Sequence, residues 1–125
     1  MLPKPTEAEL EILNVLWARG PSTVRDVHAE ICLHKPAQYT TVLKTMQIMA
    51  EKKLLTRDER QRAHVYAAGQ PREWTQKQMA GDLLQRAFGG SARNLLMGAL
   101  SARKASKDEL KAIRQLLDDY EKENQ

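Results

Sequence analysis

The chain has 125 residues, of which 42% are apolar and 5% aromatic, and its formal net charge is +4. This length gives one domain or two small ones. No stretch approaches the ~20 apolar residues that a membrane span requires, and no apolar signal segment is visible near the N-terminus. We therefore expect no membrane insertion. The single cysteine, Cys32, cannot form an internal disulfide, which is typical of a cytoplasmic protein.

Two helices are predicted in the first 33 residues. The first follows a T-x-x-E capping box at Thr6 and Glu9 and ends near residue 19, before the Gly20-Pro21 break. Its apolar residues recur at helical spacing: Leu10, Leu13, Leu16 and Trp17. The second helix is capped by Ser22 or Thr23, and its apolar residues follow the same spacing: Val24, Val27 and Ile31. A turn at residues 34–36 separates it from a third helix.

The third predicted helix, residues 38–53, has two different faces at about 100° per residue. Its apolar face consists of Tyr39, Val42, Leu43, Met46, Met49 and Ala50. The opposite face consists of Thr40, Thr41, Lys44, Thr45, Ile48 and Glu51. Hydroxyls and a cation without an early acid suit phosphates and base edges, which predicts the recognition helix of a helix-turn-helix domain. The ring of Tyr39 is expected at the core edge, from which its hydroxyl could reach the DNA backbone.

A two-stranded hairpin is predicted directly after this helix. Residues 54–57 and 64–67 are predicted to be strands joined by a charged tip. A hairpin directly after a recognition helix is called a wing. The wing arginines are candidates for phosphate or minor-groove contact, with solvated surface charge as the alternative: Arg57, Arg60 and Arg62. Arg25, near the start of the second helix, is a further candidate. Weaker candidates are Arg19, Lys35, Lys52 and Lys53.

Three more helices are predicted beyond residue 70, starting near residues 71, 92 and 107. Their apolar stripes exceed what about fifty residues can cover alone, which predicts a dimerisation domain. The residues expected at that interface are Leu83, Leu84, Phe88, Leu96, Leu100, Leu110, Ile113, Leu116, Leu117 and Tyr120. The expected fold is mainly α with a small β-wing: an N-terminal winged helix-turn-helix domain, residues 1–70, and a C-terminal helical dimerisation domain, residues 71–125.

Several segments carry a family resemblance: TEAELEIL at 6–13, LW at 16–17, TVRDV at 23–27, YTTVLKTM at 39–46, EKKLL at 51–55 and FGGS at 88–91. Together they resemble the penicillinase repressor (BlaI/MecI) family of bacterial regulators. The resemblance implies a winged helix, a helical dimerisation region, repressor dimers on short palindromic operators and a link to β-lactam resistance. It places the DNA-reading positions at Tyr39, Thr40, Thr41, Lys44 and Thr45.

The resemblance also bears on regulation. The best-known members are inactivated when a membrane-bound sensor metallopeptidase triggers cleavage of an Asn-Phe bond, so it implies such a partner. Here the matching segment reads Asn94-Leu95, and the Asn-Phe pair is absent. Related copper-responsive repressors carry paired C-x-C motifs, and their absence excludes copper sensing by that route.

Catalytic and metal-binding patterns are not found in the sequence. There is no G-x-S-x-G, no H-E-x-x-H and no Gly-rich phosphate loop, so we expect no enzyme and no cofactor. His28 and Cys32 are four residues apart, but a structural zinc site needs four ligands, so we expect no metal site. Cys32 is expected to be a small buried apolar residue.

These observations predict a dimeric DNA-binding repressor that binds a palindromic operator and is released on an inducing signal. The alternative from another class is a winged-helix module that binds a protein partner and not DNA. A third alternative is a repressor controlled by a small molecule that binds between its domains.

Overall fold

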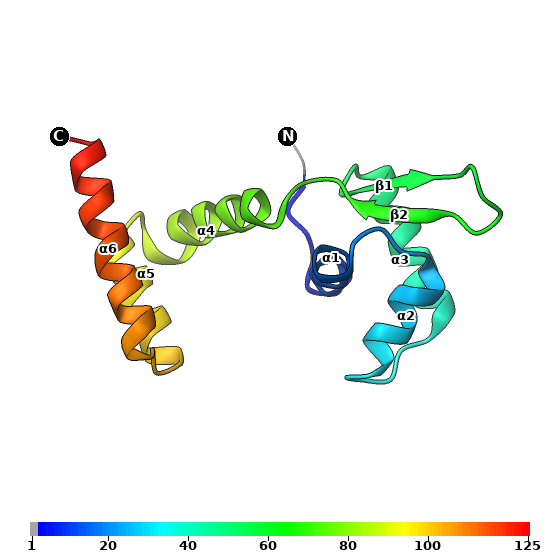
Figure 1. Ribbon diagram of the computed structural model, residues 1–125, viewed down its shortest axis with the longest axis horizontal. Helices are drawn as coiled ribbons and strands as arrows, with labels where there is room; N and C mark the ends of the chain where they lie inside the picture. Colours follow the sequence, from blue (N-terminus) through cyan, green and yellow to red (C-terminus); the bar gives the residue numbers. More distant parts are fainter. Residues whose placement is uncertain (1–2) are drawn as a thin grey trace. The chain divides into compact units, whose positions relative to one another are not determined.

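The computed structural model describes residues 3–125 (Figure 1). The elements in chain order are α1 (Glu7–Arg19), α2 (Val24–Cys32), α3 (Tyr39–Glu51), β1 (Leu55–Asp58), β2 (Val65–Ala68), α4 (Arg72–Phe88), α5 (Ala92–Ala102) and α6 (Lys107–Glu123). This order confirms the expected fold class, mainly helical with a small wing. The third helix ends at Glu51, two residues before its expected end, and both strands begin one residue later than expected.

The chain divides into two compact units, the first ending at Gly81 and the second running from Asp82 to Gln125. The division falls inside α4, whereas the sequence places the functional boundary at residue 70, which stays a prediction. Within the described residues, no helix is both long enough and apolar enough to cross a membrane.

The first unit contains the hydrophobic core. Apolar side chains from α1, α2, α3 and the sheet form one buried cluster: Ile12, Leu13, Leu16, Val24, Val27, Ile31, Val42, Met46, Met49, Leu54, Leu55 and Tyr66. Ile12, which the sequence analysis did not place in the first helix's stripe, is 2% exposed. Two methionines of α3 are fully buried, so unbranched side chains fill much of a core that has few aromatic residues.

Local capping begins the first two helices where the sequence predicts. The Thr6 hydroxyl accepts from the Glu9 amide, and the Glu9 carboxylate accepts from the Thr6 amide. Thr23, and not Ser22, caps α2 in the same reciprocal way with Asp26. Each bond joins residues three positions apart, so a short motif is enough to determine it.

The wing is attached closely to the helices. β1 and β2 are antiparallel, with Arg57 opposite Tyr66. Ser22, in the link between α1 and α2, pairs with Tyr66 through amide-to-carbonyl bonds of 2.9 and 2.8 Å in the two directions. At the other end of the hairpin, a Cβ on Gly69 would lie 2.8 Å from the Lys53 carbonyl oxygen, so only glycine allows this close approach.

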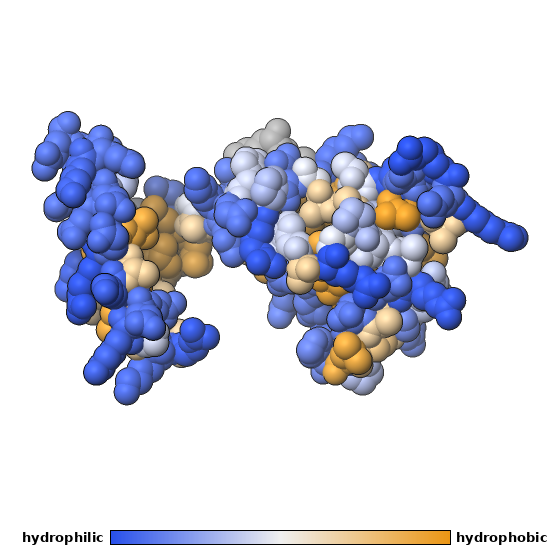
Figure 2. All heavy atoms as spheres, in the orientation of Figure 1, coloured by the Kyte–Doolittle hydropathy of each residue, from blue (hydrophilic) through white to orange (hydrophobic). Residues whose placement is uncertain are grey.

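The second unit contrasts with the first because none of its residues is buried. Its large apolar side chains stand at the surface, and hydrophobic atoms are visible over these helices in Figure 2. Those exposed are Leu83, Leu96, Met97, Leu100, Leu116, Leu117 and Tyr120. The remaining expected interface residues are half-buried: Leu84, Phe88, Leu110 and Ile113. α6 continues to Glu123, with its amino end capped by Ser106.

Candidate nucleic-acid interface

The packing of α3 decides which of its faces points outward. Val42, Met46 and Met49 are buried in the core. Thr40, Thr41 and Lys44 are exposed on the other side of the same helix. Apolar burial therefore holds the hydroxyl and lysine face toward solvent, as expected for a recognition helix.

Tyr39 differs from the expected position on the apolar face. Its side chain is 44% exposed, and its ring meets the His28 ring edge-on, with centroids 5.5 Å apart. The first turn of α3 still lies outside the core, which explains the exposure. The Nε2 of His28 lies 2.8 Å from the Ala37 carbonyl oxygen, so this histidine fixes the segment that leads into α3.

Thr45 lies on the flank of α3. Its hydroxyl donates to the Thr41 carbonyl oxygen at 2.8 Å, and the residue is half-buried. The hydroxyl proton is thus used inside the helix. Thr40, Thr41 and Lys44 are exposed, and none of their side chains makes a hydrogen bond within the described residues.

Two of the three wing arginines are held by acids of the wing itself. Arg57 lies 2.6 Å from the Glu59 carboxylate. The Arg60 guanidinium binds both carboxylate oxygens of Asp58, with its shortest contact 2.7 Å. Hydrogen bonds from the Arg60 side chain and amide lower the pKa of Asp58 to about 2. These pairs neutralise much of the wing tip.

Arg62 differs from the other two wing arginines. In the part of the chain that the structure describes, neither Arg62 nor Arg25 is in an ion pair. Both line one groove of about 520 Å³, together with Tyr39 of α3 and His64 of the wing. The fold therefore brings side chains from α2, α3 and the wing to a single concave surface, which we name the α3–wing groove, and its charged residues are Arg25, Arg62 and Asp26.

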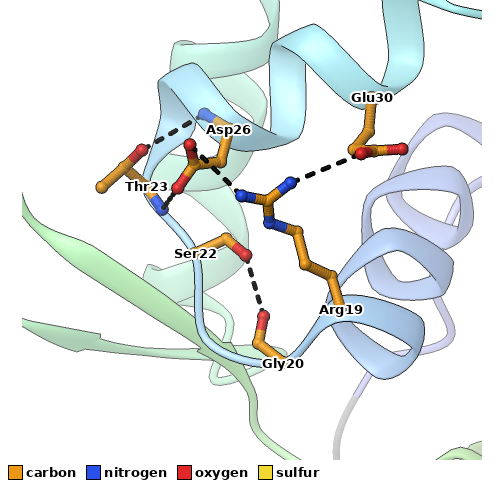
Figure 3. Close-up of polar contacts among 6 residues, drawn as sticks. All are labelled: Arg19, Gly20, Ser22, Thr23, Asp26 and Glu30. Carbon is orange, nitrogen blue, oxygen red and sulfur yellow. Dashed lines mark hydrogen bonds and ion pairs between the residues drawn. The ribbon is translucent and has the colours of Figure 1, made fainter.

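The weaker basic candidates are largely engaged within the protein. The Arg19 guanidinium lies 3.5 Å from Asp26 and 3.4 Å from Glu30, joining the end of α1 to α2 (Figure 3). Figure 3 also shows the Thr23 cap and the Ser22 hydroxyl on the Gly20 carbonyl oxygen. Lys35 pairs with Glu11 and Lys52 with Glu9, each at 2.8 Å.

The Glu9–Lys52 pair connects the start of α1 to the end of α3. Glu9 is 3% exposed. Burial by itself raises the pKa of Glu9, but the hydrogen bond from Lys52, the bonds within the Thr6 cap and the Lys52 charge outweigh it, so the pKa is lowered. The carboxylate is ionised and hydrogen-bonded, which fixes the carboxyl end of α3 against α1.

Cys32 does not occupy the buried position expected of it. It is exposed at the end of α2, with Sγ 3.3 Å from His28 Nε2 and 3.6 Å from the Ala37 carbonyl oxygen. α2 ends at this residue, so Cys32 lies beyond the last buried turn. Among residues 3–125, no group of three or more His, Cys, Asp or Glu side chains is placed to hold a metal ion.

Gln47 is a polar residue of α3 that the sequence analysis assigned to neither face. It is exposed and lines the α3–wing groove. At about 100° per residue it lies about 20° from Thr40 around the helix and about 60° from Lys44. The helical angle alone could have identified it as an outward-facing position.

Comparison with known proteins bears on what this surface does. A family model described as Penicillinase repressor matches residues 5–119. The chain is 30% identical over 116 residues to proteins named Transcriptional regulator BlaI from two Mycobacterium tuberculosis strains, CDC 1551 / Oshkosh and ATCC 25618 / H37Rv. In each case the match covers 92% of this chain and 83% of the relative.

Proposed function

The chain belongs to the penicillinase repressor family of transcriptional regulators, and from that premise we propose that it is a homodimeric repressor that acts on a palindromic operator in the cytoplasm. DNA binding follows from the family, which is one of regulators and not of enzymes. The resemblance seen in the sequence is thereby confirmed. The proposal concerns which residues contact DNA, how two chains are held together and how they are released.

The observation that carries the proposal is the outward face of α3 beside the α3–wing groove. Thr40 and Lys44 are suited to base edges and phosphates in a major groove. Arg25 and Arg62 line the neighbouring groove without an ion pair among the described residues, so they are available for the flanking phosphates. Tyr39 and Thr41 border this face, and Thr45, Arg57 and Arg60 are secondary contacts because their polar groups are already engaged.

Dimerisation is supported by the exposed apolar side chains of the second unit. Leu116, Leu117 and Tyr120 of α6 are each more than half exposed. A soluble monomer rarely leaves so many large apolar residues uncovered on so small a unit. We propose that a second copy of the same helices covers them in an isologous interface.

Two linked winged-helix units bind DNA more tightly than a single unit can. A single unit contacts few phosphates and bases, and such contacts weaken steeply with salt. Joining two units makes the second binding event intramolecular. The operator is therefore proposed to contain two half-sites whose centres are about one helical turn apart.

Release is proposed to follow from loss of the dimer. By analogy with the family, the inducing partner is a membrane-bound sensor metallopeptidase, and β-lactams are the candidate inducing compounds. The matching segment here is Asn94-Leu95 in the first turn of α5, where the Asn94 amide donates to the Ser91 hydroxyl. A protease that acts here must open this helical turn and must accept leucine after the asparagine.

Selection of binding sites from random duplex DNA tests the proposed function. We expect the purified protein to enrich a palindrome and to bind it with an affinity that falls as salt rises. A matched duplex with a scrambled half-site is the control. Failure to enrich any motif, with equal binding of all duplexes or of none, would contradict the proposal and would favour a module that binds a protein partner.

A further inference from the structure

We propose that Gln47 determines sequence specificity by reading an adenine in each operator half-site. This inference rests on the proposed function and deepens it, because it assigns a base to one side chain. Thr40 and Lys44, the proposed base contacts, lie in the first half of α3. Gln47 extends the same surface by one further turn.

The position of Gln47 on α3 is the first argument. Apolar burial of Val42, Met46 and Met49 turns the opposite side of the helix outward. Gln47 is exposed on that side, nearly in line with Thr40. At 1.5 Å per residue, the two positions are about 10 Å apart along the helix axis, which corresponds to about three base-pair steps.

The surroundings of Gln47 are the second argument. It lines the α3–wing groove on one side and a second groove of about 590 Å³ on the other, where α3 meets β1. A side chain that borders both hollows stands on the ridge between them. The major groove is wide enough to admit an α-helix, so we expect side chains on this ridge to face the base edges.

The chemistry of the amide is the third argument. Within the described residues, the Gln47 side chain makes no hydrogen bond, so its carbonyl oxygen and its NH₂ group are both available. Together they match the N6 donor and N7 acceptor that adenine presents in the major groove. Of the four bases, adenine alone offers a donor and an acceptor side by side in that arrangement.

Binding-site selection with Gln47 variants tests the assignment. We expect the wild-type motif to contain an adenine at one symmetric position in each half-site and Gln47→Ala to lose that preference alone. Discrimination at this base pair should fall by about 5- to 150-fold, as expected for the loss of a bidentate contact. Gln47→Arg should shift the preference toward guanine, and Gln47→Glu toward cytosine. Gln76→Ala, an exposed glutamine of α4, is the matched control and should leave the motif unchanged.

The outcomes separate this inference from the proposed function. If the wild-type protein selects a palindrome and Gln47→Ala selects the same palindrome with the same preference at every position, the assignment of Gln47 is wrong and the repressor function stands. If the wild type selects no motif, both the repressor function and the assignment of Gln47 are contradicted. Circular dichroism of each variant establishes that a lost preference does not come from an unfolded helix.

Discussion

Basic residues of the first unit fall into two groups that the sequence does not distinguish. Arg19, Lys35 and Lys52 are held by acids of neighbouring helices, which orients the helices toward one another. Lys44 and Arg62 are exposed, and in the described part of the chain neither has an ion-pair partner. Since a cation already paired with a carboxylate must break that pair to bind a phosphate, the second group should dominate DNA affinity.

Lys44→Ala tests the outward face of α3 directly. We expect operator binding to weaken by about 1–3 kcal/mol, the contribution of a side chain that contacts a base edge. Lys77→Ala removes another exposed lysine, from α4, and serves as the control. The measurement is a fluorescence anisotropy titration at fixed salt, and an affinity equal to that of the control would remove Lys44 from the interface.

Arg62→Ala and Arg60→Ala should differ although both residues lie in the wing. Arg62 lines the α3–wing groove, so its loss should weaken all DNA alike and reduce the salt slope by about one. Arg60 is bound to Asp58, so its loss should have the smaller effect. Titrations of specific and unrelated duplexes over a range of salt concentrations measure both quantities. A loss confined to the operator sequence would show that the wing reads bases.

At the scale of secondary-structure elements, α3 is held by interactions at both ends. His28 contacts Tyr39 and the Ala37 carbonyl at the amino end. Lys52, directly after α3, binds the buried carboxylate of Glu9. These contacts join α3 to α1 and α2, so the exposed face of α3 is held in a fixed position.

Removal of the Glu9 charge should destabilise the fold in a pH-dependent way. The pKa of Glu9 is lowered below its ordinary 4.5, so the ionised form stabilises the native state at all pH values above that. Glu9→Gln should lower the free energy of unfolding at pH 7 by about 1.5–3 kcal/mol, the range for a hydrogen bond to a charged group. The difference from wild type should shrink as the pH falls from 4.5 through the lowered native-state pKa, because the unfolded chain takes up a proton at Glu9 before the native protein does.

Urea unfolding at pH 7 and at pH 4 measures this difference. Lys52→Met should cost more at pH 7 than Glu9→Gln does, because it leaves a buried carboxylate without its cation. Glu11→Gln, which removes the partner of Lys35 at the surface, is the control and should have little effect. Equal stability of Glu9→Gln and wild type at both pH values would contradict a supporting role for the pair.

Elements set by local interactions could be predicted from the sequence, and those set by distant contacts could not. The caps at Thr6 and Thr23 connect residues three positions apart, and a short motif identifies them. The Glu9–Lys52 pair joins residues 43 positions apart, so no local pattern indicates it. The exposure of Cys32 depends on where α2 ends against the core, which helical periodicity does not specify.

The candidate site shows the same division. The apolar stripe of α3 predicts which side of the helix faces outward, and Thr40 and Lys44 lie on that side in the structure. The stripe does not indicate that Arg62 borders the α3–wing groove, because that depends on where the wing tip lies against α2 and α3.

At the scale of the whole molecule, the two units have complementary shortcomings. The first has a closed core and the exposed α3 face, which by the proposal would make too few phosphate contacts to bind an operator tightly alone. The second has no buried residue and many exposed apolar side chains. Self-association of the second unit would bury these apolar side chains, and it would also link two copies of the first unit on one DNA duplex.

Leu116→Asp tests this association. Leu116 is 67% exposed, so an aspartate is tolerated in the monomer and is buried unfavourably only in a dimer. We expect sedimentation to show monomers and operator affinity to fall with them. Gln115→Glu, which changes the charge by the same amount at an exposed position of α6, is the control. A variant that remains dimeric would move the interface away from this part of α6.

The spacing of half-sites tests the central claim that two copies of the α3 face bind one side of a duplex. The measurement compares the affinity for the selected palindrome with that for the same duplex carrying about five additional base pairs at its centre, half a helical turn. We expect two chains on the first duplex and a large loss of affinity on the second, because its half-sites point to opposite sides. Equal affinity for both duplexes, or a single chain bound to the intact palindrome, would contradict the account.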